Sequence, residues 1–434
     1  MKVQKPRGTF DVLPDEAGRW RFVEDTARRI AALYGFGEIR TPVFESTDLF
    51  VRSVGETTDI VSKEMYTFKD GAGRSLTLRP EGTASVIRAY LENSLGQTEK
   101  TARLYYLGPV FRYEKPQAGR YRQHHQFGVE AIGVAAPAGD AEIIQMLMHF
   151  YAELGIRGAA PMVNSVGCRE CRPGYNAALG GYLRERRGSL CEDCRRRAET
   201  NPLRVFDCAQ PGCAAVIAAA PRVKDHACAA CIDHFTAVLG LLDEAGIRYV
   251  VKPELVRGID YYTRTTFEIV AGELGAQNAV GGGGRYDNLV ELLGGPPTPA
   301  VGFGTGIERI LMVMRERGAA IPNEGGVEVA VVAWEPGAMP DGRRVLRELR
   351  AAGVAAEMDS AGGSLKSQMR RLDRRGIPLA LLLGGDERAR GAGRLKDMRT
   401  GEERELALDR VAGELAAREG RARGTARECG NGRP

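Results

Sequence analysis

The segment RPEGT, residues 79–83, places a carboxylate between a proline and a glycine, directly after the alternating run RSLTL. Pro-Glu-Gly is common turn chemistry, and glutamates mostly lie on protein surfaces. The alternative is that a strand ends here and directs Glu81 and Thr83 into a binding site beyond it. These five residues alone fit both interpretations, so the rest of the sequence has to decide between them.

The bulk composition predicts a multidomain globular protein. The 434 residues exceed what one hydrophobic core usually spans and indicate two to four domains. No uninterrupted apolar run approaches a membrane span, and the start MKVQKPRGTF lacks the apolar core of a secretory signal. We therefore expect a cytoplasmic protein with no membrane partner. The net charge of +5 permits a nucleic-acid partner without requiring one.

Eight of the nine cysteines form four close pairs, in the motifs CREC, CEDC, CAQPGC and CAAC. In a reducing compartment, such pairs favour metal over disulfides. Two pairs complete one tetrahedral zinc site, so four pairs predict two zinc ions. The predicted ligands are Cys168, Cys171, Cys191, Cys194, Cys208, Cys213, Cys228 and Cys231. The spacing does not say which pair joins which, and eight packed free thiols are the alternative.

Hydrophobic periodicity predicts the main elements. Helical spacing indicates helices over 15–33 and 234–247, and over 82–94 with a Thr or Ser cap. EMYTFKD and RSLTLRP, joined by GAG, predict a hairpin, and RLYYLGPVFRYE with RQHHQFGVEAIG predicts a second strand pair. A short strand carrying Pro42 is expected at a sheet edge or an interface.

Beyond residue 320 the pattern changes to alternating strands and helices, typical of an α/β domain. The last residues are poor in hydrophobics and predict disorder. The expected divisions are a main domain in two parts (1–164 and 233–322), a cysteine-rich insertion (165–232), an α/β domain (326–418) and a disordered tail (419–434).

Several stretches outside RPEGT place polar residues at strand ends or behind glycines. They carry Arg112 in VFRYE, Gln126 and Glu130 in HQFGVE, Arg257 in LVRGIDYY, glycines 281–284 in GGGGR, and Arg309 in GFGTGIERI. Each alone has a plain explanation, such as a surface salt bridge, a mobile glycine loop, or a Tyr-Tyr pair in the core.

Together these motifs resemble the class II aminoacyl-tRNA synthetases and, within them, the histidyl-tRNA synthetase family. The resemblance runs in order through KPRGTFDVLP, TLRPEGT, GPVFRYEKPQAGRYRQHHQFGVE, ELVRGIDYYTRTTFEIV, GGGGRYDNLVELLG and GFGTGIERI, and covers nearly the whole chain. It implies an α+β fold: a catalytic domain built on an antiparallel sheet flanked by helices, the cysteine-rich insertion, and a C-terminal α/β anticodon-binding domain.

The resemblance implies an ATP-dependent ligase that activates L-histidine to histidyl-adenylate, releases pyrophosphate, and transfers histidine to the 3′ end of tRNA(His). Arg112 and Arg309 are implied to clamp the phosphates, with Glu114 also at ATP. Arg257 is implied to offset charge at the α-phosphate, so that these three arginines are the catalytic residues. Magnesium is expected with the nucleotide.

Histidine carries an ammonium group and an imidazole, and both need polar partners. The resemblance implies that Glu81, Thr83 and Gln126 accept the ammonium, and that Glu130 and Tyr262 contact the imidazole. It further implies that Tyr261 shapes the pocket and that glycines 281–284 form a flat strand under the substrate. The implied histidine-binding set is completed by Gly82, Arg112 and Arg257.

The loop YEKPQAGRYRQ resembles the one that meets the tRNA acceptor stem, which implies contacts from Lys115, Gln117, Arg120 and Arg122. Family members commonly carry Arg where Lys115 stands, and Lys keeps the charge but loses the bidentate fork. The resemblance also implies a homodimer formed near the N-terminal helix and the Pro42 strand. Zinc in the insertion is expected to be structural.

Two rival functions start from the same fold. A regulatory subunit of ATP phosphoribosyltransferase usually lacks the anticodon-binding domain and parts of the LVRGIDYY and arginine set, which are present here. An RNA-binding sensor built on an inactive synthetase domain would need a fused effector domain.

Overall fold

The protein is described by a computed structural model covering residues 3–56, 58–117, 119–272, 279–319, 326–360 and 363–417. The side chains of residues 98 and 336 are excepted. The chain divides into a larger unit, Met1–Pro322, and a smaller unit, Asn323–Pro434. The expected disordered tail, 419–434, lies outside the described residues. Among the described helices, none combines the length and apolar character needed to cross a bilayer.

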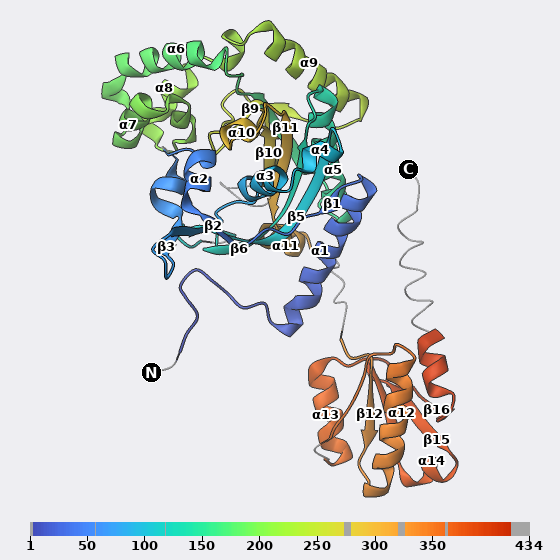
Figure 1. Ribbon diagram of the computed structural model, residues 1–434. Coiled ribbons are helices and arrows are strands. Elements are labelled where there is room, and N and C mark those ends of the chain that lie inside the picture. The colour runs from blue at the N-terminus through green and yellow to red at the C-terminus, as the bar shows by residue number, and fades with distance from the viewer. Residues whose placement is uncertain are drawn as a thin grey trace. The chain divides into compact units, whose positions relative to one another are not determined.

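The larger unit is built on an eight-stranded sheet with the order β1-β5-β6-β11-β10-β9-β7-β8 (Figure 1). The pairs β1–β5 and β7–β8 are parallel, and the other neighbours are antiparallel. The sheet is therefore the mainly antiparallel one expected. Its strands are β1 (Gly37–Glu38), β5 (Ala102–Phe111), β6 (Gln123–Ile132), β7 (Ala160–Ser165), β8 (Val250–Val251), β9 (Thr263–Val270), β10 (Ala279–Arg285) and β11 (Ala300–Gly306).

The predicted pair β5–β6 is confirmed, with a register from Ala102↔Ile132 to Phe111↔Gln123. Because side chains alternate along a strand, β6 presents two different faces. Phe127 and Val129 point into the main core, whereas Gln126 and Glu130 point to the opposite face. The short motif HQFGVE therefore builds the core and a polar surface at once.

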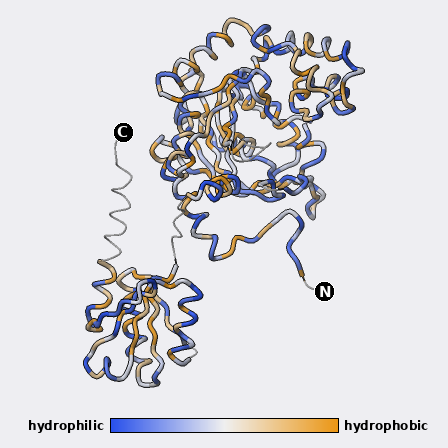
Figure 2. Tube along the Cα trace, turned by 180° about the vertical axis from the view of Figure 1, so that it is seen from behind, coloured by the Kyte–Doolittle hydropathy of each residue, from blue (hydrophilic) through white to orange (hydrophobic). Residues whose placement is uncertain are grey.

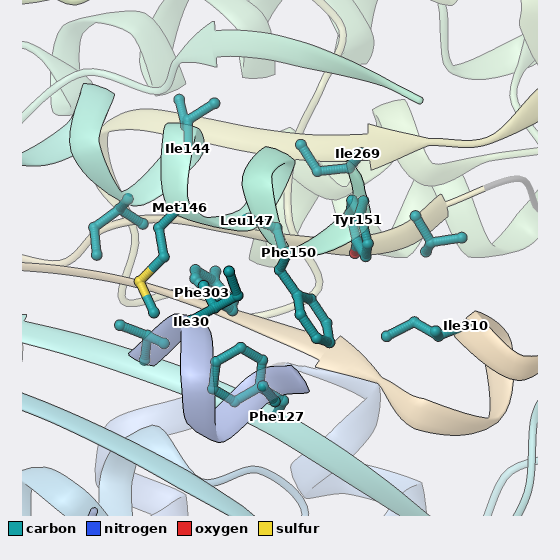
Figure 3. Packing of buried hydrophobic residues seen from close by; sticks show 14 of the residues in the cluster. Ile30, Phe127, Ile144, Met146, Leu147, Phe150, Tyr151, Ile269, Phe303 and Ile310 are labelled. Carbon is teal, nitrogen blue, oxygen red and sulfur yellow. The ribbon is translucent and has the colours of Figure 1, made fainter. Parts of the chain in front are cut away.

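One face of this sheet is covered by α1 (Pro14–Leu33), α5 (Pro137–Glu153), α9 (Ala229–Glu244) and α11 (Ile307–Glu316). Figure 3 shows side chains from α1, α5 and α11 packed around Phe127 and Phe303. Phe127 meets Phe150 and Phe303 edge-on, with ring centres 5.1 and 5.3 Å apart. Such aromatic pairs each add about 0.5–1.5 kcal/mol beyond the area they bury, so this core fixes the sheet firmly.

The other face carries α3 (Thr83–Glu92) and α10 (Leu289–Leu292), whose apolar residues form a second cluster with the sheet. Next to them lies a three-stranded sheet with the order β2-β4-β3. It consists of β2 (Phe44–Ser46), β3 (Tyr66–Lys69) and β4 (Ser75–Leu78), and the predicted β3–β4 hairpin is confirmed. The remaining helical segments here are α2 (Thr47–Val54), η1 (Ile60–Glu64) and α4 (Leu95–Thr98).

The cap of α3 differs from the one predicted. Neither Thr83 nor a serine caps the helix, because Thr83 is already its first residue. Instead, the Glu81 carboxylate accepts the backbone N–H groups of Thr83 at 2.7 Å and Ala84 at 2.8 Å. A carboxylate is well suited to this place, since the first N–H groups of a helix lack partners and carry partial positive charge.

The predicted strand carrying Pro42 is wrong in one respect. Pro42 lies in the connection between β1 and β2, and the two strands join different sheets. Proline lacks the N–H that a ladder needs, which suits Pro42 to the connection in which the chain passes from one sheet to the other. Both flanking strands are sheet edges, as expected.

The cysteine-rich insertion leaves the sheet after β7 and returns through α9. It forms a helical cluster with a hydrophobic core of its own, which includes Tyr175, Leu179 and Val205 (Figure 1). Its elements are α6 (Arg172–Glu185), η2 (Arg187–Ser189), α7 (Glu192–Thr200), η3 (Pro202–Asp207), α8 (Pro211–Ala218) and η4 (Val223–Asp225). A separate core indicates that the insertion packs as a body on the side of the large sheet.

The smaller unit has a five-stranded sheet with the order β13-β12-β14-β15-β16. Figure 2 shows hydrophobic residues concentrated in its strands and hydrophilic ones on its helices, the pattern expected of an α/β layer. Its elements are β12 (Val329–Ala333), η6 (Pro336–Ala338), α12 (Met339–Ala351), β13 (Ala356–Met358), α13 (Leu365–Arg375), β14 (Leu379–Leu383), α14 (Gly385–Ala389), β15 (Ala392–Asp397) and β16 (Glu403–Ala407). The last two strands pair as an antiparallel hairpin.

Candidate active site

Two adjoining cavities lie on the α3 face of the large sheet. The larger has a volume of about 300 Å³ and is lined by Arg112, Glu114, His124 and Arg309, among others. The smaller, about 50 Å³, is lined by Glu81, Thr83, Tyr106, Glu130 and Tyr286, among others. Both are lined by Arg112, Gln126, Arg257, Ile259, Tyr262, Gly282 and Gly304. A ligand can therefore extend from the small polar pocket into the larger one past two arginines.

These residues come from distant segments. Glu81 and Thr83 lie at the start of α3, Arg112 follows β5, and Arg309 lies in the first turn of α11. Arg257 lies in the loop between β8 and β9. The structure thus brings together the residues singled out for histidine and ATP in separate motifs, with the exception of Gly82, Gly283 and Gly284. Gly283 and Gly284 of β10 line neither cavity, unlike Gly281 and Gly282. Gly82 caps α3 and does not line either cavity.

Glu130 is the centre of the smaller pocket and is almost fully buried. Its carboxylate accepts a hydrogen bond from the Thr83 hydroxyl at 2.6 Å and another from the Tyr286 hydroxyl. Space for it comes from Gly302 on β11, where an added Cβ would lie 2.2 Å from Glu130 Oε2. In the same way Gly128 leaves room on β6, and the Tyr106 ring fills it. This carboxylate is oriented rigidly before any ligand arrives.

Burial raises the pKa of Glu130 to about 8, even though the hydrogen bonds from Thr83 and Tyr286 oppose the shift. The unfolded chain loses the same proton near the ordinary value of 4.5. Between these two values the folded state binds more protons than the unfolded state, so the stability of the ligand-free protein falls as pH rises.

We predict that Glu130→Gln removes this part of the pH dependence. The amide of the variant cannot ionise. As pH rises from about 5 to about 8, the thermal midpoint of the wild type should therefore fall relative to that of the variant. Thermal unfolding across this range measures the difference. Equal slopes for the two proteins would show that Glu130 ionises without cost in the folded state.

Tyr286 is the main residue that the sequence motifs did not single out, although it stands in the quoted stretch GRYDNL. It donates to Glu130, and its ring meets the Tyr261 ring edge-on at 5.4 Å. Tyr262, expected beside Glu130, lines both cavities. The position of Tyr286 could have indicated its role. It directly follows the glycine strand β10 and faces the pocket that those glycines leave open.

Arg257 stands where the two cavities meet. Its Nη1 donates to Glu268 Oε1 at 2.6 Å, and its Nε has no hydrogen-bond partner among the described residues. Glu268 of β9 also lines the larger cavity and was not predicted from the sequence. The pair holds one edge of the guanidinium and leaves the rest of it for a ligand.

The larger cavity has cationic walls. Arg112 donates through Nε to the carbonyl oxygen of Pro80 at 2.8 Å, and Arg309 donates through Nε to that of Gly119 at 3.2 Å. These backbone contacts fix both guanidinium groups while their outer nitrogens remain near the cavity. Burial, with help from Arg112, lowers the pKa of His124 to about 3, so this wall residue is neutral at physiological pH.

The predicted acceptor-stem residues lie on the loop after Arg112. Lys115, Gln117 and Arg120 are exposed, and the guanidinium of Arg122 stacks 3.8 Å above the Tyr113 ring. Arg120 also lines the larger cavity and pairs with Glu114 at 3.3 Å. The loop is therefore a basic rim of the site, and Arg120 faces inward.

The eight cysteines of the insertion form two groups of four, which settles a pairing that the sequence left open. Cys168 and Cys171 join Cys228 and Cys231, and the four central cysteines make the second group. Sulfur atoms in the first group lie 3.8 Å apart for Cys168–Cys171 and Cys168–Cys228. In the second, Cys191 and Cys208 lie 3.8 Å apart. Four sulfurs at about 2.3 Å from one zinc ion are also about 3.8 Å apart, so both groups fit a tetrahedral metal.

The chain matches known proteins along nearly its whole length. The family model described as histidyl-tRNA synthetase matches residues 8–169 and 189–310, and an anticodon-binding-domain model matches 328–418. A histidine–tRNA ligase of Geobacter sulfurreducens is 50% identical over 412 residues, 95% of this chain and 98% of that protein. The chain belongs to the histidyl-tRNA synthetase family.

Further relatives agree with this membership. A histidine–tRNA ligase of Pelotomaculum thermopropionicum is 48% identical over 411 residues, 95% of this chain and 97% of that protein. The crystal structure of apo histidyl-tRNA synthetase from S. aureus superposes with a TM-score of 0.80 at 37% identity, covering 96% of this chain and all of that one. The expected fold is thus confirmed. The match to an anticodon-binding domain argues against a regulatory subunit without one.

Proposed function

We propose how the residues of this site carry out the family reaction. The chain is an ATP-dependent ligase that activates L-histidine and transfers it to tRNA(His). Arg112 and Arg257 line both cavities, and this observation carries the proposal, because the carboxylate of one substrate must meet the α-phosphate of the other between cations.

Histidine occupies the smaller pocket. Each oxygen of Glu81 accepts one backbone N–H and has a further lone pair for the ammonium, for which Thr83 and Gln126 are the other acceptors. Glu130 accepts from one imidazole nitrogen, and this hydrogen bond favours its ionised form in the complex. Tyr262 contacts the other nitrogen. Tyr261 shapes the pocket through its contact with Tyr286. A ligand without ring nitrogens leaves buried groups unpaired, which disfavours it strongly.

ATP occupies the larger cavity. Arg112 acts at the α-phosphate and Arg309 at the γ-phosphate, because a guanidinium fork matches phosphate oxygens. The neutral ring of His124 adds a wall without charge. Magnesium accompanies ATP in this class and neutralises phosphate charge. Glu114 and Glu268 line the same cavity and would supply carboxylate oxygens, the ligand type that magnesium prefers.

Transfer to tRNA(His) follows at the basic rim. Lys115, Gln117, Arg120 and Arg122 approach the acceptor stem, and the smaller unit binds the anticodon. Arg120 also contacts ATP, because it lines the larger cavity. The exposed Lys115 supplies charge without bidentate base reading.

We predict that Lys115→Ala separates the two steps. ATP–pyrophosphate exchange with histidine should stay within about twofold of the wild type, because Lys115 lines neither cavity. Aminoacylation should weaken, and the slope of log(kcat/KM) against log[salt] should become shallower by about 1, as one phosphate contact is lost. Loss of exchange in this variant would instead assign Lys115 to the first step.

The two cysteine groups hold structural zinc. The sulfur spacing supports this, because four thiolates complete a tetrahedral site and leave no open position for water. We predict about two zinc ions per chain after purification in zinc, measured by mass spectrometry of the metal. Cys191→Ser and Cys228→Ser should each lower the content by about one ion. Cys429→Ser, at the ninth cysteine of the sequence, is the matched control. Equal metal content in all four proteins would contradict the assignment.

The protein is a homodimer that works in the cytoplasm. The edge strand β2 and the preceding segment expose Val43 and Phe44, 38% and 49% accessible, as a surface suited to a partner copy. A groove of about 590 Å³ on α2 and α3, lined by Leu49, Arg52 and Arg88 among others, extends this surface. Cysteines grouped for metal binding rather than for disulfides favour a reducing compartment.

A further inference from the structure

Arg204, in η3 of the insertion, reaches the loop that carries Arg257. Its Nη1 donates to the carbonyl oxygen of Arg257 at 3.0 Å, and its Nη2 donates to that of Gly258. Its Nε lies 3.6 Å from the Asp260 carboxylate. The Arg204 side chain is only 11% exposed. One guanidinium thus bridges three of four consecutive residues in this loop.

Two neighbours in the insertion strengthen the bridge. Asn201 donates through Nδ2 to Asp260 Oδ1 at 3.0 Å, and Arg197 donates through Nη1 to the carbonyl oxygen of Arg204 at 3.1 Å. All three bridging residues lie between Cys194 and Cys208, inside the segment that the second cysteine group closes. The position of Arg204 therefore depends on how that segment folds.

The contact between insertion and loop is polar rather than close-packed. A cavity of about 310 Å³ lies between them, lined by Arg172, Asn201 and Arg204 on one side and by Arg257 and Asp260 on the other, among others. A packed apolar interface would hold the loop by many small contacts, and the loss of one would be tolerated. Here a few directed hydrogen bonds hold the loop, so we expect the loss of Arg204 to be felt strongly.

Small displacements at Arg257 matter because its guanidinium must meet developing charge. A misplacement of about 1 Å can lower a rate on the order of 100-fold. We propose that Arg204 is a positioning residue for the activation step: by holding the backbone of Arg257 and Gly258, it fixes the Arg257 side chain between the two cavities. The insertion then acts on adenylate formation. This inference rests on the role proposed for Arg257.

Arg204→Met tests the bridge, and Arg196→Met is the matched control. Arg196 lies in the same segment, is 59% exposed, and pairs with Asp193. In histidine-dependent ATP–pyrophosphate exchange, Arg204→Met should lower kcat about 10-fold or more, while the KM values for ATP and histidine change less than about threefold. Arg196→Met should match the wild type. A kcat for Arg204→Met within about twofold of the wild type overturns the proposal.

A double variant distinguishes positioning from general damage. If Arg204 acts through Arg257, then Arg204→Met should add nothing to the defect of Arg257→Ala. An additive loss of the same factor overturns the proposal and assigns Arg204 a structural role. If Arg257→Ala alone leaves exchange unchanged, the role proposed for Arg257 is contradicted, and the proposal for Arg204 falls with it. If Arg204→Met does not fold, Arg204→Lys, which keeps one donor, replaces it in the same double-mutant cycle. The expected loss of kcat is then smaller.

Discussion

Glu130→Ala should lower kcat/KM for histidine in ATP–pyrophosphate exchange on the order of 10³-fold. The substitution removes the acceptor of the imidazole and leaves the Thr83 and Tyr286 hydroxyls without their partner in a buried pocket. In the free variant water can solvate these hydroxyls, and bound histidine displaces it. Each of the three buried groups then left unpaired costs about 1–3 kcal/mol, which accounts for the factor. Initial-rate exchange over a range of histidine concentrations measures it.

The effect should be confined to the amino-acid pocket. Glu130 does not line the larger cavity, so the KM for ATP should change little. Glu142→Ala is the matched control, since Glu142 is a partly exposed glutamate on α5 that pairs with Arg103. A Glu130→Ala enzyme that still activates histidine within about tenfold of the wild type would place the imidazole elsewhere.

Arg257→Ala should lower kcat for the same exchange reaction by about 10²–10³-fold, equivalent to about 2.7–4 kcal/mol of transition-state stabilisation. The reason is its place between the cavities, where charge develops on the α-phosphate as histidine attacks. The KM for histidine should change less than kcat, because the interaction strengthens in the transition state. Rapid-quench measurement of adenylate formation gives the step directly.

Arg257→Lys separates charge from geometry. Lysine keeps the positive charge but cannot both pair with Glu268 and present a second edge to the phosphate. Its kcat should fall between those of the wild type and Arg257→Ala. Arg28→Ala, at a surface arginine of α1 paired with Asp25, is the control. A full loss of histidine affinity at unchanged kcat would instead make Arg257 a binding residue for the ground state.

Local patterns predicted the elements whose periodicity is strong. The β5–β6 pair and the β3–β4 hairpin follow from alternating strand patterns joined by short polar or glycine-rich connections. Two local predictions were wrong at α3 and Pro42. A threonine beside a glycine looked like a cap, but the sequence does not reveal that Glu81 turns back onto the helix N-terminus.

The motifs also located the site, and the missing members are those whose role depends on a distant partner. Tyr286 is useful only because Glu130 lies 156 positions away in sequence and next to it in space. Glu268 lies on β9 and belongs to the site only because Arg257, on another segment, pairs with it. No spacing rule encodes such contacts.

The cysteine groups illustrate the same limit. Spacing indicated two metal sites, but the first pair joins the last pair because β7 and α9 begin and end the insertion side by side. Pairing therefore follows from the path of the chain through the fold. The bridge from Arg204 to the Arg257 loop depends on that path too, which is why no local pattern indicated it.

The central claim is that this site activates histidine. The most direct test is ATP–pyrophosphate exchange by the purified, zinc-replete protein with each protein amino acid supplied singly. We predict exchange with histidine alone. Absence of exchange with every amino acid in the folded protein, or equal exchange with another amino acid, would contradict the account.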